Sequence, residues 1–276
     1  MIPATIAEGS IPPGFAAPTS GACRWLVSLD YDGTLQQSSS SPISAEFFEQ
    51  MQAWRAHGVR WGINTGRSLN YLLQEILPCS PVLPDFICTC ERYVYQAGTD
   101  GRLHPAIKHN ELCHRHNAEL RAFLSPQLHS LQAELRRTHP QLQWEQAADD
   151  PLSIEALDSP TMDAIIPHLL PLVSEGHTIQ RAGRYMRFAD ARYTKGTALE
   201  LVRQTWQVAE GNMFIMGDGQ NDLDAFRMFP AAWCAVPAGA HAEVLDWLEQ
   251  HPEVHIAPEN DVLPELRRWF RRRVEA

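Results

Sequence analysis

Short apolar runs alternate with amphipathic segments over much of this chain. Runs of this length indicate strands that are buried on both faces of a parallel sheet. In the first segment between two runs, Phe47, Met51 and Trp54 recur at helical spacing after a capping Ser44. Strands that alternate with helices in this way predict a right-handed parallel α/β arrangement. The first three runs are 25–29, 59–63 and 86–88.

The pattern changes character between residues 91 and 190, which are richer in His and Arg. This stretch predicts a small α+β unit whose elements are a long helix over about 110–138, strands near 141–144 and 152–156, a helix from about 160 and a hairpin through 182–183. After Lys195 the alternation resumes, with helices over 196–208, 220–228 and 241–249 and strands over 213–216 and 232–236.

These patterns divide the chain into three parts. We expect a doubly wound, mostly parallel, Rossmann-like core formed by residues 23–90 and 191–276, with residues 91–190 inserted as an α+β cap. Residues 1–22 contain several Pro and Gly and no periodic apolar pattern, so we expect a disordered or extended tail there.

The charge balance limits the partners. The 276 residues carry a formal net charge of −10, which argues against nucleic acid and against an anionic membrane surface. An anionic substrate would therefore have to be attracted by local positive charge, such as a metal ion or a few cationic side chains in the site. The chain defines no oligomeric state.

Localisation is expected to be cytoplasmic. No apolar stretch approaches the roughly 18 residues of a spanning helix, and residues 1–22 lack the features of a secretory signal. The six cysteines are too few and too scattered for a disulfide framework in a chain of this length, which favours reduced thiols.

The first chemical motif is Asp30-Tyr31-Asp32-Gly33-Thr34-Leu35, directly after the first apolar run. In an extended segment residues i and i+2 point to the same side, so the carboxylates of Asp30 and Asp32 are expected to share one crevice. Open α/β sheets bind ligands at this carboxyl end of their strands. Gly33 permits a turn there at low steric cost.

A second acidic motif, Gly217-Asp218-Gly219-Gln220-Asn221-Asp222, follows the apolar run 213–216. Its carboxylates are hard oxygen ligands of the kind that suits Mg²⁺. The same residues also suit a helix N-cap, which does not exclude a metal role.

Two further motifs supply groups for binding anions. Asn64-Thr65-Gly66-Arg67 ends the second run, where a hydroxyl and backbone N–H groups are expected at a helix N-terminus. Thr194-Lys195-Gly196 precedes another helix and carries one of the few lysines. A plain helix cap and a solvated lysine are the structural alternatives.

Taken together, the four motifs describe phosphoryl transfer through a carboxylate. Asp30 is expected to attack phosphorus and form an aspartyl-phosphate, with Asp32 as general acid and base. Mg²⁺ would be held by Asp30, Asp218 and an oxygen of Asp32. Thr65 and Lys195 would hold the phosphoryl oxygens.

In kind and in order, these motifs resemble those of the haloacid-dehalogenase superfamily. The long interval between Thr65 and Lys195 resembles the branch with a large α/β cap, which includes Cof-type and sucrose-phosphate phosphatases. The resemblance implies Mg²⁺-dependent hydrolysis of a small phosphorylated metabolite, often a sugar phosphate. It also implies that Asn221 and Asp222 act around the metal and the nucleophile. We assign phosphate or substrate binding to Gly33, Thr34, Gly66, Arg67 and Asn221, and metal binding to Asp30, Asp32, Asp218 and Asp222.

Two features leave questions open. Many relatives have Asn-Gly after the third strand, whereas this chain has Cys90-Glu91-Arg92. The arginines of the last cap hairpin, Arg181, Arg184 and Arg187, are expected mainly to be exposed, with contact to an anionic or hydroxylated substrate as the alternative.

Two other functions also use these groups. A phosphomutase would return the phosphoryl group to a sugar and would be activated by a bisphosphate. A non-catalytic phosphate sensor would bind Mg²⁺ without releasing phosphate, and Asp32 argues against it because a stable phospho-signal has no use for an acid/base group.

Overall fold

A computed structural model of the chain describes residues 22–37, 42–145, 153–258 and 260–275. The expected tail therefore lies outside the described residues, except for residue 22. No helix in the described part of the chain is both long and apolar enough to cross a membrane. The cysteines whose side chains are described are free thiols: Cys23, Cys88, Cys90, Cys113 and Cys234.

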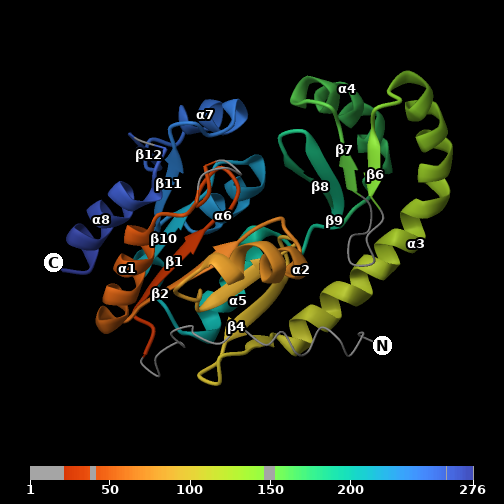
Figure 1. The fold of residues 1–276 in the computed structure, drawn as a ribbon. Coiled ribbons are helices and arrows are strands. Elements are labelled where there is room, and N and C mark those ends of the chain that lie inside the picture. The colour runs from red at the N-terminus through yellow and green to blue at the C-terminus, as the bar shows by residue number, and fades with distance from the viewer. Residues whose placement is uncertain (1–21, 38–41, 146–152, 259, 276) are drawn as a thin grey trace.

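An eight-stranded sheet forms the larger part of the molecule (Figure 1). Its first six strands pair in parallel, and the last two are joined to them through antiparallel pairing. In spatial order they are β12 (His255–Ala257), β11 (Trp233–Pro237), β10 (Met213–Met216), β1 (Trp25–Leu29), β2 (Val59–Asn64), β3 (Phe86–Thr89), β4 (Tyr93–Ala97) and β5 (Leu103–Pro105). The predicted fold class, a doubly wound and mostly parallel α/β sheet, is confirmed.

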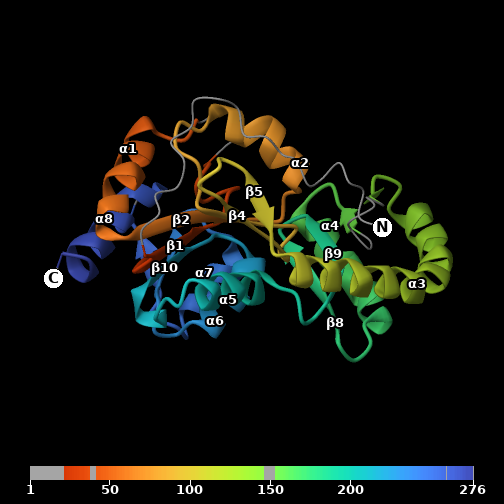
Figure 2. The same cartoon turned by 90° about the horizontal axis from the view of Figure 1, so that it is seen from below.

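Helices cover both faces of this sheet, as Figure 2 shows. On one face lie α1 (Ala45–Trp54), α2 (Leu69–Tyr71) and α8 (Val262–Arg273). On the other lie α5 (Lys195–Thr205), α6 (Leu223–Met228) and α7 (Ala242–Leu248). Burial on both faces explains why the central strands are almost continuously apolar.

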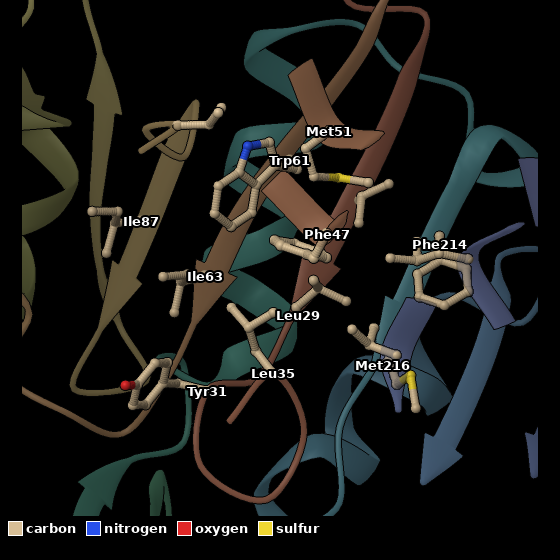
Figure 3. Packing of buried hydrophobic residues seen from close by; sticks show 14 of the residues in the cluster. Leu29, Tyr31, Leu35, Phe47, Met51, Trp61, Ile63, Ile87, Phe214 and Met216 are labelled. Atoms are coloured by element: carbon tan, nitrogen blue, oxygen red, sulfur yellow. The ribbon is translucent and has the colours of Figure 1, made fainter. Parts of the chain in front are cut away.

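The packing of the first face is dense and partly aromatic (Figure 3). Phe47 of α1 meets Trp61 of β2 edge to face, with 5.2 Å between ring centroids. Ser44 caps α1 by accepting a hydrogen bond from Phe47 N, as its position in the sequence predicts. Gly58 follows α1 and its terminal 3₁₀ turn in a left-handed conformation, φ 80°, which ends the helical segment.

A separate antiparallel sheet has the order β6 (Gln143–Glu145), β7 (Ser153–Glu155), β9 (Tyr185–Asp190) and β8 (His177–Ala182). It packs with α3 (Ile107–Thr138) and α4 (Ser159–Leu169) around its own hydrophobic cluster. Leu124 of α3, Ile165 of α4 and Phe188 of β9 are fully buried there. These elements lie beside the large sheet in Figure 1.

The start of the expected insertion differs from the structure. Residues 91–190 were expected to leave the core together, but β4 and β5 pair with β3 in the large sheet. The side chain of Asn110, near the start of α3, holds β4 in place through hydrogen bonds with the N–H and C=O groups of Val94. The chain therefore leaves the large sheet at α3.

Candidate active site

Asp30 lies at the carboxyl end of the central strand β1. Its backbone N–H donates to Met216 C=O at 2.9 Å, which joins the ends of β1 and β10. The chain then turns sharply through Gly33, φ 76°, and the buried side chain of Leu35 anchors the returning segment. Asp30 is left buried, with 7% of its surface exposed, at the point where the strand order reverses.

Asp218 and Asp222 come to the same place from the loop after β10, because β10 pairs directly with β1. Carboxylate oxygens of Asp30, Asp218 and Asp222 all lie within 4.8 Å of one another. Thr34 Oγ1 donates to Asp218 Oδ1 at 3.2 Å, and Gly219 N–H donates to Asp222 Oδ2 at 3.0 Å. Two segments almost 190 residues apart thus form one buried acidic group.

Lys195 supplies the cation for this group. Its Nζ donates to Asp30 Oδ1 at 2.8 Å and to Asp222 Oδ1 at 2.7 Å, and its side chain is only 1% exposed. Lys195 is the first residue of α5, whose capping box is built by Thr194. Asn64 at the end of β2 donates to Lys195 C=O at 3.0 Å, which fixes the start of α5 against the sheet.

The electrostatics of the group favour binding of a cation. Burial, with the charges of Asp30 and Asp222, raises the pKa of Asp218 to about 8. Burial raises the pKa of Asp222 to about 7, although Lys195 opposes that shift. For Lys195 burial alone would lower the pKa, but Asp222 and Asp30 outweigh burial and the pKa is raised. The group has more carboxylates than positive charges, and its clustered oxygen atoms are suitable ligands for a hard divalent cation such as Mg²⁺.

The carboxylate of Asp32 is not part of this acidic group. Arg67 binds it through two hydrogen bonds, from Nε at 2.8 Å and from Nη2 at 2.9 Å. The expectation of a shared crevice assumed an extended chain, but the chain is already turning at Tyr31. Both partners of the pair are about half exposed, so Asp32 lies nearer the mouth of the site than Asp30.

Thr65 is buried at the end of β2, beside the end of β3. Its N–H donates to Cys88 C=O at 2.9 Å, and its Oγ1 accepts from Arg67 N–H at 3.1 Å. The expected helix N-terminus at this position is wrong, because α2 begins at Leu69 and its cap is Ser68. As an acceptor, the hydroxyl oxygen of Thr65 stabilises the turn that leads to Arg67.

Two residues of this region were missed or misplaced by sequence reasoning. Asn221 Nδ2 donates to Glu91 Oε1 at 2.7 Å, which brings a buried fourth carboxylate to the acidic loop. Arg187 of β9, expected to be exposed, is 2% exposed and donates to Cys90 C=O at 3.1 Å and Gly66 C=O at 3.0 Å. A visible signal for Glu91 was its place directly after β3, at the edge of the sheet that carries the other motifs.

The other two arginines of the hairpin do not reach this region. Arg184 is exposed and pairs with Glu155, and Arg181 pairs with Asp163. The hairpin tip nevertheless touches the acidic loop, since Gly183 N–H donates to Gln220 Oε1 at 3.4 Å.

Comparison with known proteins was made at the levels of sequence and structure. No family model matches the chain, and no curated protein matches it by sequence. Solved structures do match. The sucrose-phosphatase of Synechocystis sp. PCC6803, solved with sucrose and phosphate, has a TM-score of 0.65 at 17% identity, covering 87% of this chain and 93% of its own.

Two further structures give similar values. SMU.1108c of Streptococcus mutans UA159 has a TM-score of 0.64 at 12% identity and covers 90% of this chain and 99% of its own. The haloacid dehalogenase-like hydrolase yhjK of Bacillus subtilis has a TM-score of 0.60 at 12% identity and covers 93% of this chain and 94% of its own. The chain therefore has the fold of the haloacid-dehalogenase-like hydrolases, as its four motifs predicted.

Proposed function

We propose that this protein is a Mg²⁺-dependent phosphomonoester hydrolase that works through an aspartyl-phosphate on Asp30. The observation that carries the proposal is the convergence of Asp30, Asp218 and Asp222 within 4.8 Å, with Lys195 Nζ bonded to two of them. Three buried carboxylates beside a buried ammonium are costly for folding alone, and such perturbed groups are concentrated at functional sites.

Asp30 is the nucleophile. One of its carboxylate oxygens forms a bond to phosphorus while the bond from phosphorus to the ester oxygen breaks. Arg67 donates to both oxygens of Asp32, so this pair opens when the ester binds and Asp32 takes up a proton. Asp32 then gives this proton to the leaving alkoxide and accepts a proton from the water that attacks the phosphoryl group on Asp30. Lys195 and Thr65 hold the phosphoryl oxygens, where the transition state spreads its negative charge.

Asp30, Asp218 and Asp222 would hold the Mg²⁺ ion. When bound, the ion supplies positive charge that allows an anionic ester to approach an anionic nucleophile. Thr34 orients Asp218 through its hydroxyl, and the pair of Asp32 with Arg67 fixes the general acid near the entrance. Gly66 and Asn221 are tied to the same region by their hydrogen bonds with Arg187 and Glu91.

Residues of the smaller sheet, with α3 and α4, serve as a cap over this site. The contact of Gly183 with Gln220 places the β8–β9 hairpin against the acidic loop. We assign substrate selection to this cap and propose a sugar or polyol phosphate as the substrate class. The solved sucrose-phosphatase, which has a similar fold, supports this class.

The test is release of inorganic phosphate from a broad panel of phosphomonoesters, with Mg²⁺ and with EDTA. We expect turnover only with Mg²⁺, and a loss of more than about 10³-fold in Asp30→Asn. Full activity in Asp30→Asn would remove Asp30 as nucleophile. Phosphate release from no ester, despite Mg²⁺ binding, would favour a sensor, and activation by a bisphosphate would favour a mutase.

A further inference from the structure

Glu91 has an unfavourable backbone conformation and a buried carboxylate. It follows Cys90, the first residue after β3. The φ value is 49° at Cys90 and 64° at Glu91. Left-handed conformations of this kind favour Gly or Asn and strain other residues. Glu91 is nevertheless 3% exposed. Neither property favours folding, and strained or buried charged residues of this kind are concentrated at functional sites.

The carboxylate of Glu91 lies inside the candidate active site. Its Oε1 accepts from Asn221 Nδ2 at 2.7 Å, and its backbone N–H donates to Thr65 C=O at 3.0 Å. A Cβ atom on Gly66 would lie 3.3 Å from Glu91 Oε1. The charge of Glu91 also helps to raise the pKa of Lys195. Glu91 thus stands among three of the four motifs.

The second oxygen of this carboxylate has no protein donor. Glu91 Oε2 is buried, and no hydrogen-bond partner for it exists among the residues that the structure describes. An ionised carboxylate only accepts hydrogen bonds, and a buried acceptor without a donor is costly. The missing donor must therefore come from a molecule other than the described protein, such as water or a bound substrate.

The surrounding charges select the kind of donor. Lys195 and Arg187 lie near Glu91, since the position of a Cβ on Gly66 is 3.4 Å from Arg187 Nη2 and 3.3 Å from Glu91 Oε1. These cations disfavour a donor that is itself an ammonium group. A substrate carboxylate would be repelled by Glu91 itself. A neutral hydroxyl group satisfies both conditions.

We propose that Glu91 Oε2 accepts a hydrogen bond from a hydroxyl of the substrate's leaving group and so makes the site selective for polyol and sugar phosphates. This inference rests on the proposed function, and it assigns part of the substrate recognition to a residue outside the cap. A hydrogen bond to a buried charge contributes enough to discriminate by roughly 10- to 100-fold against an analogue without the hydroxyl.

The test compares kcat/KM for esters matched in carbon skeleton. Glycerol 1-phosphate is paired with propyl phosphate, and sorbitol 6-phosphate with hexyl phosphate. We expect the wild type to favour the hydroxylated member of at least one pair by about 10-fold or more. Phenyl phosphate reports separately on the phosphatase activity itself. Its hydrolysis, with equal rates within both pairs or with neither pair hydrolysed, overturns the inference alone, whereas no hydrolysis of any ester overturns the proposed function as well.

Variants then assign the selectivity to Glu91. Glu91→Gln keeps an acceptor for Asn221 but removes the charge, and we expect the ratio of kcat/KM between the hydroxylated and plain members of each pair to fall most of the way to one, whatever common factor the variant imposes on all esters. Glu91→Asp keeps the charge and serves as a second variant in case Glu91→Gln fails to fold. Glu46→Gln removes a similar charge from the exposed first turn of α1 and is expected to leave the preference unchanged. A parallel fall for every ester in Glu91→Gln, or a preference that survives in it, overturns the inference.

Discussion

Arg67 binds both carboxylate oxygens of Asp32, at 2.8 and 2.9 Å, and its guanidinium carbon lies 4.6 Å from the centre of the Tyr71 ring. The proposed general acid is therefore held by two hydrogen bonds from one planar guanidinium group, on the exposed side of the site. Lysine cannot reproduce two parallel hydrogen bonds from one group.

We accordingly expect Arg67→Lys to lower kcat by about 10-fold. Because the side chains of both partners are nearly half exposed, the pair contributes only about 0–1 kcal/mol to stability, so Tm should shift by less than about 3 °C. Steady-state kinetics and thermal unfolding check the two parts. An unchanged kcat would show that the pair does not position Asp32.

The tight packing of Gly33 against Asp218 leads to a second prediction. Gly33 has φ 76°, and a Cβ there would lie 2.2 Å from Asp218 Oδ2. Gly33→Ala must therefore displace a proposed metal ligand, and we expect phosphatase activity to fall by about 100-fold or more.

Gly101 provides the matched control for this variant. It has nearly the same conformation, φ 73°, but a Cβ there meets nothing within 4 Å. Gly101→Ala thus carries a similar backbone cost, about 1 kcal/mol, without the collision. Equal losses of activity in the two variants would assign the effect to backbone strain rather than to Asp218.

The raised pKa values of the acidic group predict how stability depends on pH. With pKa values of about 8 for Asp218 and about 7 for Asp222, the metal-free folded protein holds protons that the unfolded chain releases near pH 4. The folded state binds more protons between these values, so stability falls as pH rises from about 4 to about 8.

Thermal unfolding in EDTA at about pH 6 and about pH 8 measures this slope. We expect Tm to be lower at the higher pH, Mg²⁺ to restore it by binding the ionised carboxylates, and Asp218→Asn to flatten the slope. A slope that persists unchanged in Asp218→Asn would mean that other groups control it.

The buried hydrogen bonds of Arg187 lead to a prediction about stability. Arg187→Met leaves Cys90 C=O and Gly66 C=O without their donor in a buried place, at a cost of about 2–4 kcal/mol. Arg184→Met is the control, because Arg184 lies three residues before Arg187 in the chain and is exposed, and it should cost less than about 1 kcal/mol. Chemical denaturation measures both values, and similar costs would contradict the structural role of Arg187.

The sequence predicted most of what local patterns determine. The apolar run 25–29 became β1, and the Gly-containing acidic motifs identified Asp30 and Asp218, because a buried parallel strand and the turn after it each have a strong local pattern. The hairpin of β4 and β5 was not recognised, although Tyr93–Ala97 is rich in strand-forming residues and Gly98 and Gly101 follow it.

The hydrogen-bond partners that come from distant parts of the chain could not be predicted in the same way. Nothing near Glu91 in the chain indicates that Asn221, 130 positions away, completes its hydrogen bonding. The burial of Arg187 likewise depends on how the β8–β9 hairpin meets the loops after β2 and β3. Such contacts arise from tertiary packing, which no short window of sequence encodes.

The position of β1 between β10 and β2 has a consequence for how this protein matures. The strand that carries Asp30 is made early, yet its neighbour β10 emerges from the ribosome almost 190 residues later. A nascent or truncated chain that lacks β10 has the proposed nucleophile but neither Asp218 nor Asp222 beside it. Under the proposed function, activity would then arise only after residue 222 of the 276 has been made, and phosphate release could serve as a direct assay for synthesis and assembly.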